Sequence, residues 1–318
     1  MTLRCAILDD YQHVALAMAD WSTLEPHIEV VTFHDHISDQ NTLVETLAEF
    51  DIIVAMRERT LFPAALLERL PRLKLLITSG MRNAAIDIEA ARARGIIVCG
   101  TGGNSEPPTE LSWALILGLA RHLLTESNAI HSGGPWQSTV GIGLAGKRLG
   151  LLGLGKIGAK MARIAQAFGM EVIAWSEHLT RERCDELGVE RAASKEALLT
   201  ASDIVSIHLV LSERTHGLIG TRELELMKPQ ALLINTSRAA IVDQKALIEA
   251  LQNSRIAGAG LDVFDAEPLP LDHPLRRLPN VLATPHIGYV ADVNYRTYFQ
   301  EAVEDIEAFL NGKPVRTL

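Results

Sequence analysis

The sequence predicts an α/β protein built from two doubly wound parallel-sheet domains. Short apolar runs rich in Val, Ile and Leu alternate with longer amphipathic stretches, and a loop rich in Gly and Pro at residues 100–108 interrupts this alternation once. The chain has 318 residues, which corresponds to two domains at about 150 residues each. Alternation of strands and helices predicts parallel sheets that are covered by helices on both faces.

The first hundred residues contain five candidate strands separated by candidate helices. We expect strands at residues 3–8, 28–33, 52–55, 75–77 and 96–99, and helices at 14–21, 42–49, 63–70 and 87–94. Gly95 predicts the end of the last of these helices, because glycine adopts positive φ without steric cost.

A second series of strands and helices follows the loop. Strands are expected at residues 148–152, 171–175, 204–209, 231–235, 256–261 and 281–283. An amphipathic helix is expected at 292–310, and a long apolar helix at 109–124. A helix that is apolar on all sides must be buried, either within its own chain or against a second copy.

Composition and charge argue against several classes of protein. Hydrophobic residues make up 47% and charged residues 22% of the chain, which is typical of a globular protein. The formal net charge of −9 argues against a nucleic-acid partner. We expect no membrane span, because no run approaches about 18 apolar residues. Three cysteines without a CxxC pair, and no signal peptide, indicate the reducing cytoplasm.

The clearest motif is a glycine-rich turn between a predicted strand and a predicted helix. Gly153, Gly155 and Gly158 have the spacing GxGxxG, directly after the strand at 148–152. The first glycine permits a tight turn, the second lets the backbone approach a pyrophosphate, and the third lets helix pack against strand. The intervening Lys156 and Ile157 begin the helix, whose N-terminal N–H groups favour an anion. We therefore predict a dinucleotide cofactor here.

The residue expected to hold the adenosine ribose is unusual. A carboxylate is typical at about 20 residues beyond the first glycine, but that position holds Ser176, and Glu177 follows one residue later. His178, Arg181 and Arg183 are close enough in sequence to approach a 2′-phosphate. NAD and NADP both stay open, with a slight preference for NAD because no arginine directly follows the serine.

Three predicted strands of the second half end in polar residues. Arg238, Glu267 and His286 lie just beyond the carboxyl ends of these strands, where ligands bind in open parallel sheets. Each alone has an ordinary explanation, as a surface turn, a solvated loop or a hydrogen-bonded core residue. Together, and after a dinucleotide fingerprint, they indicate a single reaction.

With these motifs in order, the sequence resembles the D-isomer-specific 2-hydroxyacid dehydrogenase family, which includes glyoxylate/hydroxypyruvate reductases and phosphoglycerate dehydrogenases. The resemblance covers nearly the whole chain. The matching segments are residues 56–60 (MRERT), 78–83 (TSGMRN), 153–158 (GLGKIG), 235–238 (NTSR) and 285–288 (PHIG).

The resemblance implies a Rossmann cofactor domain, residues 103–284, inserted into a flavodoxin-like substrate domain of residues 1–102 and 285–318. It implies a homodimer built on the helix at 109–124. The implied catalytic residues are Arg238, Glu267 and His286. The implied cofactor residues, beyond the glycine turn and Ser176, are His208, Thr236, Asp262 and Gly288. The implied substrate residues are Met56, Arg57, Ser79, Gly80 and Tyr289.

The residue types support reduction of a 2-keto acid to a D-2-hydroxy acid. Arg238 is suited to bind the carboxylate, and the resemblance implies that backbone N–H groups near Ser79 and Gly80 bind its other side. His286 is suited to exchange a proton with the substrate oxygen, while Glu267 orients the ring. Nicotinamide supplies the hydride chemistry. For Asp262 a strand-end cap, and for His208 a buried hydrogen-bonded residue, are alternative interpretations.

Two further features carry hypotheses. Tyr289 follows the glycine of the PHIG segment, and with Trp136 and Met56 it predicts a substrate with a compact or apolar tail. His34 and His36 alternate on a strand end, but two histidines without further ligands do not predict a metal site.

The sequence leaves three alternatives to a 2-keto-acid reductase. A non-catalytic NAD-sensing protein is disfavoured by the intact Arg238, Glu267 and His286 set. A regulated phosphoglycerate dehydrogenase would need a further domain after Leu318, so only a short phosphoglycerate dehydrogenase stays as an alternative. Formate dehydrogenase chemistry is disfavoured because Glu267 adds an anion near the site.

Overall fold

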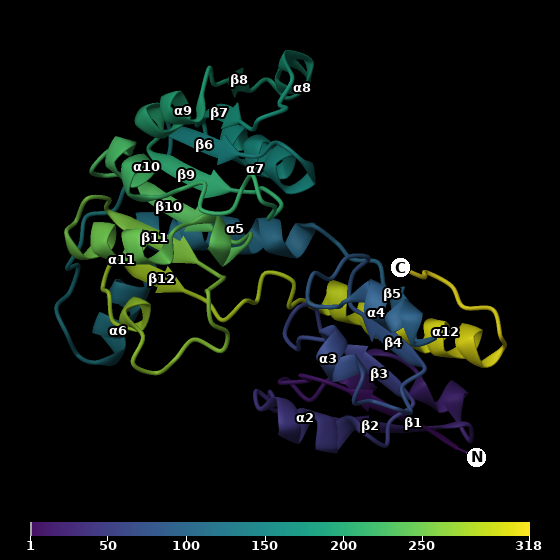
Figure 1. Cartoon of the computed structure of the whole chain (residues 1–318). Coiled ribbons are helices and arrows are strands. Elements are labelled where there is room, and N and C mark those ends of the chain that lie inside the picture. Colours follow the sequence, from purple (N-terminus) through teal and green to yellow (C-terminus); the bar gives the residue numbers. More distant parts are fainter. Residues whose placement is uncertain (1) are drawn as a thin grey trace. The chain divides into compact units, whose positions relative to one another are not determined.

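The chain folds into two compact units (Figure 1). The structure is a computed structural model that describes residues 2–318. The first unit comprises the chain up to Asn104 together with Val290–Leu318, and the inserted unit comprises Ser105–Tyr289. The sequence places the same transitions at 102/103 and 284/285.

The first unit is built on a five-stranded parallel sheet. Its strand order is β2-β1-β3-β4-β5, which is the order of the flavodoxin-like domain that the family resemblance implies. The strands are β1 (Leu3–Ile7), β2 (Ile28–Thr32), β3 (Ile52–Ala55), β4 (Leu75–Thr78) and β5 (Ile97–Gly100). All residues of β3 and β4 are buried, as expected of parallel strands covered on both faces.

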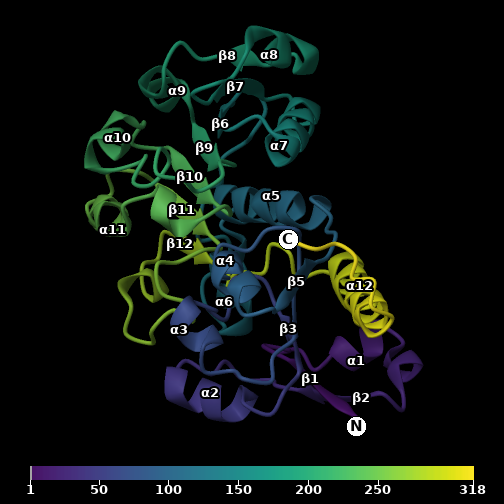
Figure 2. The same cartoon turned by 45° about the vertical axis from the view of Figure 1, so that its right-hand side comes forward.

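Helices cover both faces of this sheet. One face packs against α2 (Gln40–Leu47), α3 (Ala64–Leu67) and α4 (Ile88–Ala93), around a core that includes Leu47, Ile53 and Phe62. The other face carries α1 (Ala15–Met18), the 3-10 turn η1 (Trp21–Leu24) and the terminal helix α12 (Asp292–Leu310), which lies beside α1 in Figure 2. The observed bounds of α12 are those predicted.

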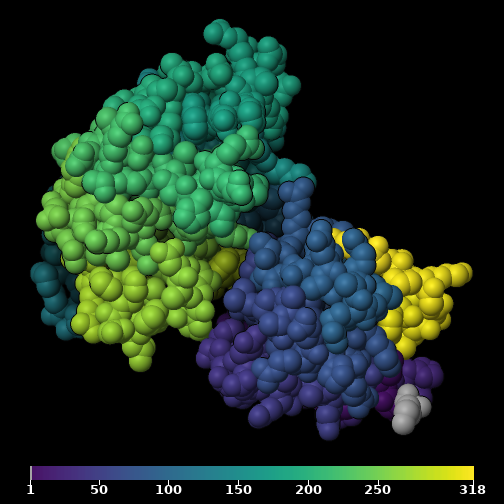
Figure 3. All heavy atoms as spheres, viewed as in Figure 1, coloured from purple at the N-terminus to yellow at the C-terminus, as the bar shows by residue number. Residues whose placement is uncertain are grey.

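The chain's last residues pack onto this unit. Leu318 N–H donates to the carbonyl of Val98 at 2.9 Å, and Thr317 forms a bridge with Cys99 on β5. In Figure 3 the yellow C-terminal part of the chain lies against the blue residues of the same unit. The C-terminal segment therefore completes the unit that the N-terminal hundred residues begin.

The inserted unit is built on a seven-stranded parallel sheet. The order β12-β11-β10-β9-β6-β7-β8 reverses between β6 and β9, as in a Rossmann sheet. The strands are β6 (Arg148–Leu152), β7 (Glu171–Trp175), β8 (Glu190–Arg191), β9 (Ile204–Ile207), β10 (Leu232–Asn235), β11 (Gly258–Leu261) and β12 (Val281–Ala283). The two-residue β8 was missed from the sequence.

Alternate residues of the central strands enter two different cores. Leu152, Val205 and Leu233 face the core under α9, α10 and α11, whereas Leu151 and Ile234 face the core under α5, α7 and α8. The helices are α5 (Glu106–Ala120), α7 (Lys156–Ala167), α8 (Arg181–Leu187), α9 (Lys195–Ala201), α10 (Thr221–Leu226) and α11 (Gln244–Gln252). Short 3-10 turns lie at η2 (Ala239–Ile241) and η3 (Pro274–Arg276).

Side chains preceding many of these helices cap them. The residue before the first turn accepts a hydrogen bond from a backbone N–H two or three positions later, which satisfies a donor that the helix leaves unpaired. Such caps are Asp39, Asp87, Thr180, Ser194 and Asp243.

The apolar helix predicted at 109–124 ends earlier than expected. Helix α5 stops at Ala120, His122 has a φ of +49°, and a second helix, α6 (Leu123–His131), begins after it. The prediction was wrong here because apolar residues continue across the break without a glycine to mark it. No helix among residues 2–318 has both the length and the apolarity that crossing a membrane requires.

Candidate active site

The loop after β12 presents a histidine paired with a carboxylate. His286 Nδ1 lies 2.6 Å from Glu267 Oε2, and the other carboxylate oxygen of Glu267 accepts a hydrogen bond from Phe264 N–H at 2.8 Å. The side chains of His286 and Glu267 are 22% and 33% exposed. Among residues 2–318, Nε2 of His286 has no hydrogen-bond partner, so this nitrogen is available to a ligand.

The backbone of this loop is held by a buried aspartate. Asp262, which directly follows β11, accepts hydrogen bonds from Thr284 Oγ1 at 2.6 Å and from the N–H groups of Ile287 and Gly288 at 2.8 Å each. Burial raises the pKa of Asp262, and the three hydrogen bonds oppose that rise. All three donors belong to the protein, so the carboxylate caps the strand end. Its role toward a nicotinamide amide stays a prediction.

His286 has an unusual backbone and an aromatic neighbour. Its φ is +53°, a left-handed conformation that side chains rarely adopt. Its ring meets that of Tyr289 edge to face, with centroids 5.6 Å apart. Tyr289 is 8% exposed, and it therefore limits how the imidazole can turn. Backbone strain of this kind clusters at functional sites.

Arg238 follows β10 on a turn shaped by Asn235. The Asn235 side chain accepts from Ser237 N–H at 3.1 Å and donates to the Arg238 carbonyl at 3.0 Å. Arg238 Nη1 donates to the Ser237 carbonyl at 2.8 Å, and the residue is half-buried. Thr236, in the same turn, shares a 2.7 Å hydrogen bond with Ser112 on α5.

The glycine turn has the geometry expected for a pyrophosphate. Gly153 has a φ of +99°, and a Cβ there would lie 2.6 Å from the His208 carbonyl oxygen. A Cβ on Gly158 would collide with the Gly153 carbonyl. A Cβ on Gly155 would meet nothing within 4 Å, so the backbone at the start of α7 faces open space. Lys156 is exposed and Ile157 packs partly against the core.

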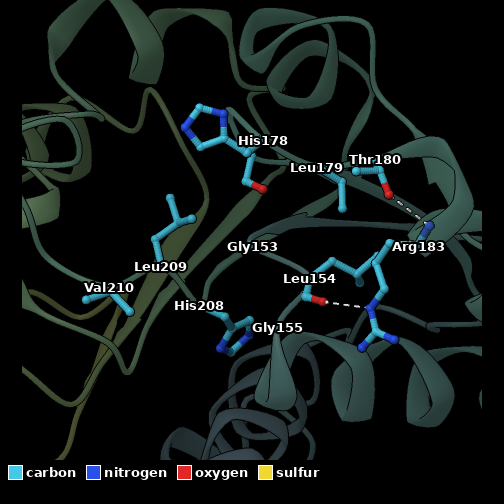
Figure 4. Close-up of a pocket in the computed structure, with 11 residues that line it drawn as sticks. Gly153, Leu154, Gly155, His178, Leu179, Thr180, Arg183, His208, Leu209 and Val210 are labelled. Atoms are coloured by element: carbon cyan, nitrogen blue, oxygen red, sulfur yellow. Dashed lines mark hydrogen bonds between the residues drawn. The ribbon is translucent and has the colours of Figure 1, made fainter.

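A cavity of about 330 Å³ lies beside this turn (Figure 4). Three segments of the inserted unit line it, after β6, β7 and β9. The lining residues are Gly153, Leu154, Gly155, Ser176, His178, Leu179, Thr180, Arg183, His208, Leu209 and Val210. Of these, the sequence did not single out Leu154, Leu179, Leu209 and Val210, because apolar lining residues resemble core residues, nor Thr180, which caps α8.

His208 lines this cavity as a neutral group. It keeps part of its surface exposed, but protein atoms surround the ring, and this desolvation lowers its pKa to about 4. Its Nε2 lies 2.9 Å from the buried Ser206 hydroxyl. The ring is hydrogen-bonded and also borders the cavity, and its role toward a cofactor stays a prediction.

The predicted substrate residues of the first unit lie on two neighbouring loops. Arg57 Nη1 donates to the Ser79 carbonyl at 3.1 Å, and Ser79 Oγ donates to Met56 Sδ at 3.2 Å. The N–H of Ser79 donates to Ala55, and that of Gly80 donates to Thr101 Oγ1 at 2.9 Å. A substrate carboxylate would have to replace these partners, so binding through these two N–H groups stays a prediction.

The histidines at 34 and 36 are paired individually. His36 Nδ1 lies 3.0 Å from Asp9 Oδ1, and His34 Nδ1 contacts the carbonyl of Asp10 at 3.1 Å. The hydrogen bond to Asp9 raises the pKa of His36. Within the described part of the chain, no three His, Cys, Asp or Glu side chains are arranged to hold a metal ion.

Comparison with known proteins identifies the family. Residues 113–288 match the family "D-isomer specific 2-hydroxyacid dehydrogenase, NAD binding domain". The glyoxylate reductase of Aeropyrum pernix is 42% identical over 78% of this chain and 76% of its own length. A phosphoglycerate oxidoreductase from Vibrio cholerae is 38% identical, with a TM-score of 0.93 over 98% of this chain and all of the other.

The chain belongs to the D-isomer-specific 2-hydroxyacid dehydrogenase family. It is an NAD-dependent oxidoreductase of small 2-keto and 2-hydroxy acids, as the sequence predicted. The D-3-phosphoglycerate dehydrogenase of Methanocaldococcus jannaschii is 34% identical, and the match spans only 52% of that protein.

The inserted unit of this dehydrogenase fits a dinucleotide. The space at Gly155 admits a pyrophosphate against the N-terminus of α7, where free N–H groups and the helix dipole favour an anion. The cavity beyond it is large enough for part of an adenosine. Gly153, Gly155 and Gly158 would hold the phosphates, and Ser176 would lie toward the ribose.

Proposed function

We propose that His286 is the acid–base catalyst of a 2-keto-acid reductase. The observation that carries this proposal is the 2.6 Å contact between His286 Nδ1 and Glu267, which leaves Nε2 available. With Nδ1 held by the carboxylate, Nε2 is the nitrogen that exchanges a proton with a substrate oxygen. NADH, when bound, supplies the hydride that the carbonyl carbon accepts.

The proton balance follows from this arrangement. His286 as imidazolium gives the Nε2 proton to the carbonyl oxygen, so the keto acid becomes a hydroxy acid and the ring becomes neutral. Solvent then returns the proton for the next turnover. In the oxidative direction the neutral ring takes the proton from the hydroxyl group. Glu267 holds the ring in one orientation throughout, and its own bond to Phe264 N–H keeps the carboxylate in place.

Arg238 is proposed to bind the substrate carboxylate. Arg238 is half-buried and lies on a turn that the Asn235 side chain holds with two hydrogen bonds, one accepted and one donated. A planar guanidinium binds a carboxylate through two parallel hydrogen bonds and also orients the neighbouring carbonyl. Arg238→Lys keeps the charge but loses this geometry, so we expect KM for the keto acid to rise about tenfold or more.

Glyoxylate is the substrate that we propose for this enzyme, on the basis of the glyoxylate reductases among the relatives. Tyr289 packs on the His286 ring and favours a compact tail. The test is a panel of glyoxylate, hydroxypyruvate, pyruvate and longer 2-keto acids, with NADH consumption followed by absorbance. We expect the highest kcat/KM for the shortest acids, and Tyr289→Ala should broaden the range. Cofactor binding without turnover of any acid would instead support a sensor.

We also propose a homodimer formed through α6 and the loop after it. Helix α6 buries none of its residues, whereas most of α5 is buried within its own unit. This segment exposes apolar side chains that a second copy would cover, namely Leu123, Leu124, Ile130, Trp136 and Val140. Light scattering should give twice the 34.7 kDa chain mass, and Ile130→Glu should shift it toward the monomer.

The reducing cytoplasm is the proposed location of the enzyme. Cys5, Cys99 and Cys184 are all free and buried, and burial raises the pKa of each thiol. Such thiols are unreactive packing residues. Expression with a fluorescent fusion and fractionation of the source cells would test this location.

A further inference from the structure

The cavity beside the glycine turn points to a second form of the cofactor. We propose that it accommodates the 2′-phosphate of NADP(H), so that this dehydrogenase uses NADP(H) as well as NAD(H), with Ser176 and Arg183 as the determining residues. This inference rests on the dinucleotide-binding role of the inserted unit, and it does not depend on which acid is reduced.

The first observation is the absence of a carboxylate where the ribose hydroxyls are expected. A carboxylate at the end of the second strand of such a sheet accepts hydrogen bonds from the ribose and repels a 2′-phosphate. Here β7 ends at Trp175, and the neutral Ser176 lines the cavity instead. The next residue, Glu177, does not line it, and its Oε2 lies 3.2 Å from Arg214 Nη1.

The second observation is a guanidinium in the cavity wall. Arg183 reaches from α8 toward the glycine turn, where its Nε donates to the Leu154 carbonyl at 3.4 Å (Figure 4). Its Nη1 donates to Glu186 Oε2 at 3.0 Å, and among residues 2–318 its Nη2 has no hydrogen-bond partner. The arginine is thus held against the phosphate turn with a donor left for a phosphate oxygen.

Other polar groups at the cavity also suit a phosphate. His178 Nε2 lies 2.7 Å from Arg214 Nη1, which places a second guanidinium next to the lining. Glu177 pairs with Arg214, and Glu186 pairs with Arg183. The positive charge of each arginine offsets the repulsion that its carboxylate would exert on a phosphate. An arginine nearby with no acid at the strand end is the arrangement that accepts NADP.

The test compares two nucleotides that differ only by a 2′-phosphate. The full chain is titrated calorimetrically with ADP and with 2′,5′-ADP, so that no turnover is needed. We expect 2′,5′-ADP to bind about tenfold more tightly, since the extra phosphate gains a charge-assisted bond, and the difference should shrink as salt is added. The Kd values of NADPH and NADH, from protein fluorescence, should show NADPH bound at least as tightly.

Variants assign the effect to residues. Arg183→Gln should remove the preference for 2′,5′-ADP over ADP. Ser176→Asp should reverse the preference. Arg181→Gln is the matched control, since Arg181 is exposed and does not line the cavity, and its Kd values should equal those of the wild type.

Two results would overturn the proposal in different ways. If the wild type binds ADP as tightly as 2′,5′-ADP or more tightly, the 2′-phosphate site is refuted while dinucleotide binding stands. If neither nucleotide binds, the assignment of this cavity to the cofactor fails as well.

Discussion

Each unit of this dehydrogenase holds a histidine paired with a carboxylate at the carboxyl edge of its sheet, and the two pairs differ in their surroundings. In the first unit, His36 contacts Asp9, whose side chain is 1% exposed and also accepts from Thr60 Oγ1 at 2.7 Å. The Asp9 carbonyl accepts from Arg59 at 2.7 Å. Asp9 is thus committed to protein partners on every side.

In the inserted unit, the pair formed by His286 and Glu267 keeps more of its surface open. Both side chains retain exposed surface, and the histidine has a left-handed backbone that an aspartate-held loop stabilises. A histidine and a carboxylate therefore form a structural contact where the carboxylate is enclosed, as Asp9 is. They form a candidate proton relay where both the histidine and the carboxylate keep exposed surface, as His286 and Glu267 do.

The largest expected difference between the pairs is in catalysis. His286→Gln removes the proposed proton donor, so kcat for keto-acid reduction should fall about 10³-fold, with the Kd of NADH unchanged. His36→Gln is the matched control and should keep kcat within about twofold. Equal losses of kcat in His286→Gln and His36→Gln, measured by steady-state kinetics, would contradict the distinction between the two pairs.

The next effect concerns the carboxylate of the catalytic pair. Glu267→Gln keeps the size of the side chain but loses the charge that orients His286, and kcat should fall about 10²-fold. Circular dichroism should show an unchanged fold. A variant with the wild-type kcat would show that the 2.6 Å contact has no role in turnover.

A smaller effect is expected on stability. Asp9→Asn weakens hydrogen bonds to a buried group, so the free energy of unfolding should fall by about 2 kcal/mol and Tm by roughly 5 °C. The control Glu267→Gln should change Tm less, because its site is more exposed. Calorimetric scans that give the opposite ranking would contradict the assignment of Asp9 to a structural role.

The smallest effect is a pH dependence. The folded-state pKa of His36 is raised, chiefly by its bond to Asp9. Its stabilising contribution is therefore complete below the unfolded value of 6.5 and is lost as pH rises through the folded value. The Tm difference between wild type and His36→Gln should shrink as pH rises from 6.5 through the raised pKa of His36. A difference that grows over this range would refute the pairing.

The sequence predicted the fold well where buried side chains recur with the period of the helix or strand that contains them. The bounds of β6, β7, β12 and α12 match the prediction, because parallel strands read as apolar runs and α12 is amphipathic. The break at His122 was missed, since its left-handed conformation has no glycine signal. The short β8 was missed because two exposed residues carry no pattern.

The candidate site was only partly predictable. Glycine spacing and polar strand ends predict roles for Gly153, Arg238 and His286, because such positions share one edge of a parallel sheet. The hydrogen-bond partners of each side chain depend on the conformation of the loops, which the periodicity of apolar residues does not predict. The hydrogen bonds by which Asp262 holds the loop after β12 and the placement of Arg183 against Leu154 became visible only in three dimensions.

The central claim is that Nε2 of His286 delivers the proton, and rescue of a truncated variant tests it most directly. The rate of NADH oxidation with saturating glyoxylate is measured for His286→Ala without and with added imidazole, at fixed pH. We predict a rate about 10³-fold below the wild type that rises in proportion to imidazolium concentration. A variant that turns over at the wild-type rate without imidazole would contradict the account.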